Sequence, residues 1–216
     1  MGWLLSNEYP ELRLIRLPRN HGKGYAVRTG ILNATGRTVL FADADGSTPI
    51  GELERLEAAL TSGADVAIGS RALQDRGVRV EAKLYRHLIG RTFHHLVEWL
   101  ADAGVKDTQC GFKLFRFAVA QDLFSRVRMN GFSFDVEVLL MARRRGYRVT
   151  EVPVNWSHKP GSKVLLTYDS LRMAADLFRI RTNWLRGEYE IPQLAACSHA
   201  IDTGSSLPEL ANSTAV

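Results

Sequence analysis

Short apolar runs alternate with longer amphipathic segments along most of the chain. The short runs predict strands at residues 12–17, 38–42, 64–68, 112–117 and 148–154. The longer segments have apolar positions three or four residues apart and predict helices at residues 25–34, 52–60, 84–100, 135–145 and 170–184. Strands that alternate with helices in this way are typical of an α/β fold with a mostly parallel sheet flanked by helices.

The periodic pattern stops near Tyr189, and the remaining residues are rich in Ser, Ala and Pro. Such a segment buries too little apolar surface to fold, so we expect a folded domain at residues 1–187 and a disordered tail at residues 188–216. The 216 residues are 45% hydrophobic, which suffices for one well-buried domain. No apolar run approaches the ~20 residues that span a bilayer, and no signal peptide is evident.

The chain has a formal net charge of +5 and a pI of about 9.4. This basic excess fits anionic partners such as nucleotide phosphates, acidic lipids or nucleic acid, and does not choose among them. The two cysteines, Cys110 and Cys197, lie far apart in different kinds of segment. A reduced, cytosolic chain is the simplest interpretation.

Two aspartates follow the apolar run 38–42, and they are the most informative polar residues of the chain. Asp43 and Asp45 stand one residue apart at the end of this predicted strand. Ligands gather at the carboxyl ends of strands in open α/β sheets, and hard cations such as Mg²⁺ bind carboxylates together with substrate phosphates. An Asp-x-Asp pair also occurs often as a solvated turn. Its position at a strand end favours a site for a divalent metal and a diphosphate.

Two more segments are predicted to lie near strand ends. The turn at residues 20–24 contains Gly22, Lys23 and Gly24 between a predicted strand and a helix, where backbone N–H groups can approach an anion. On spacing alone, a plain tight turn is the better interpretation. Arg71 follows the strand at 64–68 and should project from the same sheet edge as the aspartates. A phosphate-binding arginine and an exposed loop arginine are equally well supported.

Residues 107–113 are dense in polar groups between a predicted helix and a predicted strand. Asp107 could act as a general base and Lys113 could hold a phosphate, or the segment could be an Asx-type turn with a solvated lysine. We expect Cys110 to be a small packing residue. Further on, Ser133 or Asp135 opens a helix, and a capping role is the better interpretation of both.

The last predicted helix has two distinct stripes. Met173, Leu177, Ile180 and Trp184 form an apolar stripe, and the basic stripe repeats every seven residues at Arg172, Arg179 and Arg186. Such a helix suits the headgroup layer of a membrane, but it can equally pack on its own domain.

Six segments taken together resemble the family-2 glycosyltransferases. They are NHGKGYAVRTG (20–30), LFADADGST (40–48), IGSR (68–71), DTQCGFKLF (107–115), FSFDVE (132–137) and VPVNWSHKPGSK (152–163). The likeness is greatest to the branch of the dolichyl-phosphate β-glucosyltransferases, to which DTQCGFKLF is especially specific, and dolichyl-phosphate mannose synthases are cousins. The resemblance covers roughly residues 12–187.

The resemblance implies a GT-A fold and an inverting transfer of a sugar, with glucose from UDP-glucose as the expected case, to a polyprenyl or dolichyl phosphate. It implies Mg²⁺ or Mn²⁺ as cofactor, with Asp45 as the main metal ligand and Asp43 near the ribose and the metal. In mannose synthases a glutamine two places after the second aspartate also binds metal, and this chain has Ser47 there.

The resemblance also implies roles for the remaining motif residues. Asp107 matches an acidic position proposed as a base, although an ionised acceptor phosphate needs no strong base. The implied donor phosphate ligands are Gly22, Lys23, Gly24, Arg71 and Lys113, and the implied ligands of the acceptor phosphate are Ser162 and Lys163. A lipid acceptor implies peripheral contact with the cytoplasmic face of a membrane through the helix at residues 170–186, and nucleic acid is not expected as a partner.

The chain departs from the family pattern at its start. The family begins with an apolar strand ending in a Pro-x-Tyr-Asn-Glu-like string and a second strand ending in Asp-Asp-Gly-Ser, and residues 1–10 resemble the helix that follows these strands. The expected sheet then has a gap about two strands wide, roughly 10 Å, and exposed strand edges. We therefore expect an N-terminally truncated GT-A domain whose 216 residues transfer no sugar alone. The alternatives are an inactive membrane- or nucleotide-binding fragment and a nucleotidyltransferase.

Overall fold

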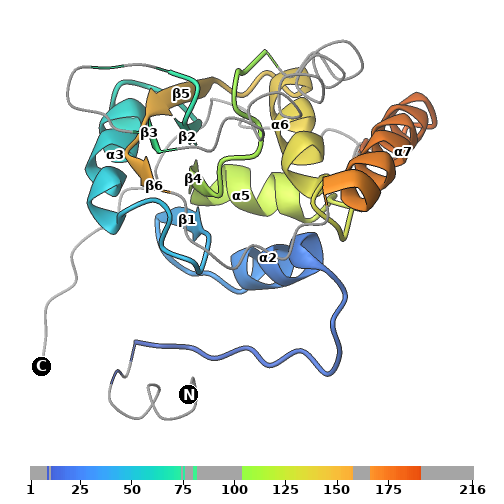
Figure 1. Cartoon of the computed structure of the whole chain (residues 1–216), viewed down its shortest axis with the longest axis horizontal. Helices are drawn as coiled ribbons and strands as arrows, with labels where there is room; N and C mark the ends of the chain where they lie inside the picture. Colours follow the sequence, from blue (N-terminus) through green and yellow to red (C-terminus); the bar gives the residue numbers. More distant parts are fainter. Residues whose placement is uncertain are drawn as a thin grey trace, which may run out of the picture.

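The structure is a computed structural model, and it describes residues 9, 11–73, 75, 80–81, 104–157 and 166–190. The described helices are α2 (Lys23–Leu32), the 3-10 helix η1 (Ile50–Glu52), α3 (Leu53–Thr61), α5 (Phe117–Phe124), α6 (Phe134–Arg144) and α7 (Leu166–Leu185). The described strands are β1 (Thr38–Ala42), β2 (Val66–Ser70), β3 (Val80–Glu81), β4 (Phe112–Arg116), β5 (Val149–Pro153) and β6 (Trp156–Ser157). These elements form an α/β fold (Figure 1).

The main sheet has the strand order β1-β4-β2-β5. Because β4 pairs antiparallel with both β1 and β2, and β5 pairs parallel with β2, three of the four strands run in one direction. The expectation of a mostly parallel sheet holds for strand direction. It fails for pairing, since the reversed β4 lies between β1 and β2. This insertion brings the loop before β4 to the same sheet edge as the carboxyl ends of β1 and β2.

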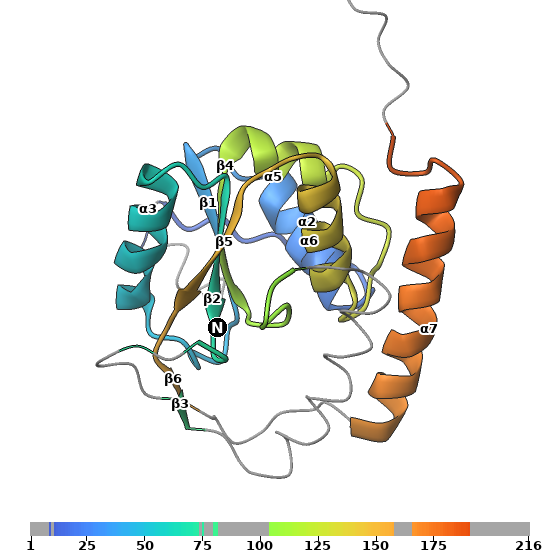
Figure 2. The ribbon, with the colours of Figure 1, turned by 90° about the horizontal axis from the view of Figure 1, so that it is seen from above.

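Helices cover both faces of the sheet. Figure 2 shows α3 on one face and α2, α5 and α6 on the other, with α7 outside α6. Leu56 and Leu60 of α3 pack with Phe112 and Leu114 in one apolar cluster. The larger cluster fills the opposite side and reaches Leu177 of α7. No helix in the described part of the chain is long and apolar enough to cross a bilayer.

Several predicted elements are confirmed with small shifts. The strands at 38–42, 112–117 and 148–154 and the helices at 25–34, 52–60 and 135–145 are present, and the last helix begins four residues earlier than expected. The predicted strand at 64–68 lies at Val66–Ser70, because Asp65 is at the turn where it accepts a hydrogen bond from the Arg148 N–H (2.9 Å). The predicted helix at 84–100 lies outside the described residues.

The predicted strand at residues 12–17 is wrong. This segment is extended but joins no ladder, and Leu12, Leu14 and Ile15 are exposed. A strand needs a neighbour that satisfies its backbone groups, and among the described strands β1 pairs only with β4. Figure 1 shows residues 11–22 running outside the sheet toward α2.

The packed part of the chain extends beyond residue 187, where the folded domain was expected to end. Tyr189 is only 2% exposed, stacks on Trp184, and donates a hydrogen bond from its hydroxyl to Glu137 Oε1 (2.7 Å). The chain is therefore packed at least as far as Tyr189. Residues 191–216 lie outside the described part.

Candidate active site

The loop after β1 meets the start of α2. The Asp43 N–H donates to the Gly111 carbonyl oxygen (2.8 Å), which fixes this loop against the segment before β4. The Asp43 carboxylate forms an ion pair with Lys23 Nζ (2.8 Å), and both side chains are partly exposed. Two motifs that lie twenty residues apart in the sequence thus meet at one sheet edge.

Gly111 makes room for the Asp43 carboxylate. A Cβ atom at position 111 would overlap both carboxylate oxygens of Asp43. The backbone of the segment before β4 therefore lies directly against this acidic group, and only glycine permits that approach.

The turn at residues 20–24 rests on the backbone of residues 129–131. Gly22 has a φ of +102°, and a Cβ there would overlap the Asn130 carbonyl oxygen. That oxygen accepts hydrogen bonds from the N–H groups of Gly24 (2.8 Å) and Tyr25 (3.4 Å). The glycines allow this contact, so the turn presents Lys23 to Asp43. A cavity of about 440 Å³ lies beside the turn and is also lined by residues from α7.

Arg71 is held by Asp107. The guanidinium donates to both Asp107 carboxylate oxygens (2.7 Å each), and the Arg71 backbone N–H donates to Asp107 Oδ2 (2.9 Å). Burial acts to raise the pKa of Asp107, but the Arg71 guanidinium outweighs it and holds that pKa below its ordinary value. An ionised carboxylate engaged in this way is a weak base, so the geometry gives Asp107 the task of orienting Arg71. The Arg71 guanidinium lies 5.4 Å from the centre of the Trp156 ring.

Lys113 points into the protein. Its side chain is 1% exposed, and its ammonium donates to Asp135 Oδ1 and to the Cys110 carbonyl oxygen, both at 2.6 Å. The structure therefore does not bring Lys113 to the open edge where the other predicted phosphate ligands lie. Its ion pair with Asp135 instead joins β4 to α6 in the interior of the protein. Burial raises the pKa of Asp135, and the neighbouring ammonium opposes that rise.

The capping interpretation of Ser133 and Asp135 is wrong. Ser133 is the N-cap residue of α6 but makes no side-chain capping bond, and its hydroxyl donates to Asp176 Oδ2 of α7 (2.9 Å). Asp135 is engaged by Lys113 instead. Buried polar groups take whichever partner the fold brings near, and here the partners lie on other elements. Cys110 is buried as expected, and burial raises the pKa of its thiol to about 11, so the thiol stays protonated.

Asp43 and Asp45 supply the oxygen donors that a divalent cation needs. Asp45 is exposed, and one of its carboxylate oxygens accepts the Ser47 N–H (2.9 Å), which leaves the other oxygen directed away from that turn bond. The described residues contain no group of three or more acidic, histidine or cysteine side chains that could hold a metal by themselves. Two carboxylates completed by substrate phosphate oxygens are a usual donor set for Mg²⁺ and related ions. Asp43 and Asp45 therefore fit a divalent cation that is bound together with substrate phosphates. The predicted acceptor ligands Ser162 and Lys163 lie outside the described residues.

Comparison with known proteins identifies the family. Residues 4–124 match the family described as "Glycosyl transferase family 2". The chain belongs to glycosyl transferase family 2. It is 39% identical over 193 residues to the dolichyl-phosphate β-glucosyltransferase of Saccharomyces cerevisiae, covering 84% of this chain and 58% of that protein. It is 37% identical over 189 residues to the human protein of the same name, covering 85% and 58%. The chain thus spans less than two thirds of the length of these relatives.

A solved structure supports the fold. Glucosyl-3-phosphoglycerate synthase from Mycobacterium tuberculosis, in complex with Mn²⁺, UDP and glucosyl-3-phosphoglycerate, superimposes with a TM-score of 0.54 at 16% identity, covering 88% of this chain and 61% of that one. At this identity the likeness establishes the GT-A fold of the family-2 glycosyltransferase and nothing more about its ligands.

Sequence reasoning missed some residues that shape the site in this family-2 glycosyltransferase. Glu151 accepts the N–H groups of Lys106 and Asp107 (2.9 Å each) and so holds the loop that presents Asp107. Glu137 is fully buried and in the same way accepts the N–H group of Met129 in another loop. A glutamate within a predicted strand or helix gives no local signal of this role, because its backbone partners lie in other segments of the chain.

Proposed function

We propose that the protein transfers glucose from UDP-glucose to a polyprenyl phosphate such as dolichyl phosphate, with inversion at the sugar and with the help of a divalent cation. The observation that carries the proposal is the meeting of Asp43, Asp45, Lys23 and Arg71 at one sheet edge. The identity to dolichyl-phosphate β-glucosyltransferases supports the choice of donor sugar and acceptor.

The charges at this edge suit a nucleotide diphosphate. Asp43 and Asp45 would hold Mg²⁺ or Mn²⁺, and a related fold has been solved with Mn²⁺ and UDP. A cation held by these two residues would neutralise negative charge that develops on the departing diphosphate. Lys23 and Arg71 add two positive charges whose side chains are partly exposed, so they can approach phosphate oxygens.

The transfer is a substitution at the anomeric carbon. A bond forms between a phosphate oxygen of the acceptor and C1 of the glucose, and the bond between C1 and the β-phosphate oxygen breaks, so the electron pair leaves with UDP. A phosphate monoester is already largely ionised near neutral pH, because its second pKa is about 6. No general base has to remove a proton, which agrees with the engagement of Asp107 by Arg71.

A lipid acceptor requires contact with a membrane, and α7 offers a surface for it. The apolar stripe predicted for this contact is unavailable, since Met173, Leu177 and Ile180 are buried against the domain. Another side of the helix exposes Phe178 (55%) and Leu185 (78%). Exposed arginines flank them at Arg179, Arg181 and Arg186. Apolar residues among basic ones fit an anionic headgroup layer, which is typical of the cytoplasmic leaflet, and we place the contact there.

The direct test is transfer of labelled glucose. The chain, and a version extended upstream with the two strands of the family pattern, are incubated with UDP-glucose, Mn²⁺ and a short polyprenyl phosphate in detergent, with 3-phosphoglycerate as the competing acceptor and GDP-mannose as the competing donor. The proposal predicts that the extended version forms a glucosylated polyprenyl phosphate and no glucosylated phosphoglycerate. Metal-dependent UDP-glucose binding without transfer would leave the alternative of an inactive nucleotide-binding fragment. Neither binding nor transfer would contradict the proposal altogether.

A further inference from the structure

Glu137 is a buried carboxylate that ties together three parts of the chain. It lies on α6 and is 0% exposed. Its Oε1 accepts the Tyr189 hydroxyl (2.7 Å), and its Oε2 accepts the Met129 N–H (2.9 Å). The Arg128 N–H lies 3.1 Å from both oxygens. Each of these partners is a donor, which is the arrangement that a buried carboxylate needs.

The segment that Glu137 holds supports the turn of the active site. Residue 130 follows directly after the two N–H groups that Glu137 binds, and its carbonyl oxygen accepts the Gly24 and Tyr25 N–H groups. A Cβ at Gly24 would lie 2.5 Å from the Met129 carbonyl oxygen, so the turn and this segment are in direct backbone contact. Lys23 lies between these contacts and reaches Asp43.

We infer that Glu137 is a positioning residue for the turn that binds the donor phosphates. It fixes residues 128–130, this segment fixes Gly22 and Gly24, and the turn fixes Lys23 against Asp43. This inference rests on the proposed function for its consequence in donor binding, while the contacts themselves do not depend on it.

The carboxylate itself is required. Glu137→Gln keeps the size of the side chain but replaces one acceptor oxygen by an NH₂ group, which would face N–H or O–H donors. One or two charge-assisted hydrogen bonds are lost, and such bonds are shorter and stronger than hydrogen bonds between neutral groups. The segment 128–130 then loosens, and misplacement of a binding group by about 1 Å can cost on the order of a hundredfold in rate.

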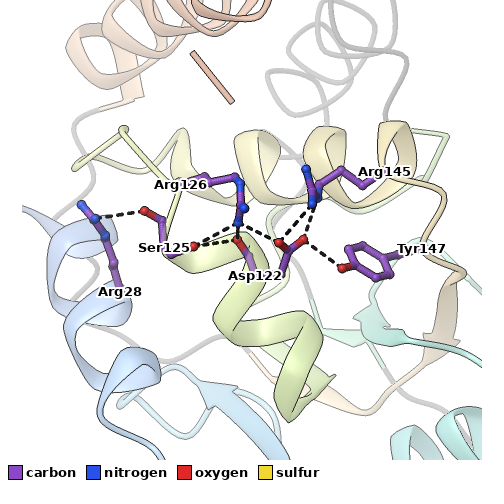
Figure 3. Close-up of polar contacts among 6 residues, drawn as sticks. All are labelled: Arg28, Asp122, Ser125, Arg126, Arg145 and Tyr147. Atoms are coloured by element: carbon purple, nitrogen blue, oxygen red, sulfur yellow. Dashed lines mark hydrogen bonds and ion pairs between the residues drawn. The ribbon is translucent and has the colours of Figure 1, made fainter. Parts of the chain in front are cut away.

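A second carboxylate that accepts several hydrogen bonds supplies the control. Asp122 of α5 accepts hydrogen bonds from Arg145 Nε (2.6 Å) and from the Tyr147 hydroxyl (2.8 Å), and Figure 3 shows these contacts together with Arg126. Arg145 follows the carboxyl end of α6, whereas Glu137 lies near the amino end of that helix. Asp122→Asn therefore removes a comparable carboxylate without touching residues 128–130.

Hydrogen exchange measured by mass spectrometry tests the inference without any ligand. In Glu137→Gln, exchange of the peptides that contain residues 20–25 and 128–131 should accelerate about tenfold. In Asp122→Asn these peptides should exchange as in the unmodified protein, while residues 117–126 and 145–148 exchange faster. Unchanged exchange at residues 20–25 in folded Glu137→Gln would overturn the inference.

Binding of UDP with Mn²⁺, measured by calorimetry, is the second test of the inference. If the unmodified chain binds and Glu137→Gln binds about tenfold more weakly while Asp122→Asn is unchanged, the inference is supported. Equal binding by all three overturns it. If the unmodified chain does not bind UDP, the proposed function fails while the exchange result still decides the inference. Should Glu137→Gln not fold, Tyr189→Phe replaces it, and no faster exchange at residues 128–131 in that variant would contradict the inference.

Discussion

At the scale of single residues, the site depends on close approach between backbone and charged side chains. Gly111 lies against the Asp43 carboxylate, Gly22 lies against the Asn130 carbonyl oxygen, and Lys23 reaches Asp43 from the turn between them. The chemical groups are ordinary, and the glycines decide where they lie.

Gly111→Ala should weaken metal-dependent donor binding, because the added Cβ would displace the Asp43 carboxylate. We expect at least a tenfold loss of affinity for UDP-glucose in the presence of Mn²⁺, measured by calorimetry, which equals about 1.4 kcal/mol or more. The matched control is Gly30→Ala on α2, where a Cβ would meet nothing within 4 Å. That variant should keep its affinity and gain up to about 1 kcal/mol in stability. Unchanged binding by Gly111→Ala would show that the position of Asp43 does not matter.

Residue positions were predicted well where the sequence places a residue at a strand end. Asp43, Asp45 and Arg71 were expected at one edge, and the common direction of β1 and β2 puts them there. Lys113 could not be placed, since its burial depends on Asp135, which is 22 residues away and on another element. A lysine one residue inside a strand has the same local sequence whether it faces solvent or a buried carboxylate.

At the scale of elements, the reversed strand β4 joins the two halves of the site. Its preceding loop contributes both Gly111 and Asp107, which contact the loops after β1 and β2. The sequence predicted β4 as a strand but not its direction, because hydrophobic alternation is the same for either direction. The helix α5 was missed altogether, as its eight residues are too short for a clear period. The segment 12–17 has the pattern of a strand, yet no described strand pairs with it.

The contact between Arg71 and Asp107 should make stability depend on pH in a defined sense. Arg71 holds the pKa of Asp107 below its ordinary value of 3.8. A carboxyl group with a lowered pKa in the folded chain stabilises it above the unfolded pKa, and this contribution disappears as the pH falls through the folded pKa. Asp107→Asn should therefore cost about 2 kcal/mol at pH 7, as expected for hydrogen bonds to a charged group.

Urea unfolding at pH 7 and below pH 4 provides the measurement, with exposed Glu54→Gln as the control. The difference between Asp107→Asn and the unmodified chain should shrink on acidification. Comparing variants is necessary because burial raises the pKa values of Asp135 and Glu137, whose contributions are lost as the pH rises. A cost for Asp107→Asn that stays constant over this pH range would contradict the ionised pair.

At the scale of the whole molecule, the membrane proposal depends on which face of α7 points outward. Figure 2 shows α7 beyond α6, at the outside of the helical layer. The sequence predicted the helix, and Arg179 and Arg186 of its basic stripe are exposed. It could not tell that Met173, Leu177 and Ile180 are buried against the domain. Both stripes of an amphipathic helix are visible in a sequence, whereas the surface that receives the apolar stripe is not.

Co-sedimentation with vesicles that contain phosphatidylserine tests the exposed face. The triple variant R179Q/R181Q/R186Q should bind more weakly, and binding of the unmodified chain should fall as salt is added. Each basic residue near an anionic surface is worth about 1 kcal/mol, so the three together account for up to about a hundredfold in partitioning. The control R13Q/R16Q/R37Q removes the same charge from exposed positions elsewhere. Equal losses in both triple variants would show that vesicle binding depends on net charge and not on the arginines of α7.

The central claim is that the loop after β1 holds a cation together with the diphosphate of a nucleotide sugar. Calorimetric binding of UDP-glucose, with Mn²⁺ and with EDTA, tests it most directly in the unmodified chain, Asp45→Asn and Glu54→Gln. The account predicts that binding needs the metal, that Asp45→Asn weakens it by at least about tenfold, and that Glu54→Gln on the neighbouring helix α3 leaves it unchanged. Equal binding with Mn²⁺ and with EDTA, or equal effects of the two substitutions, would contradict the account.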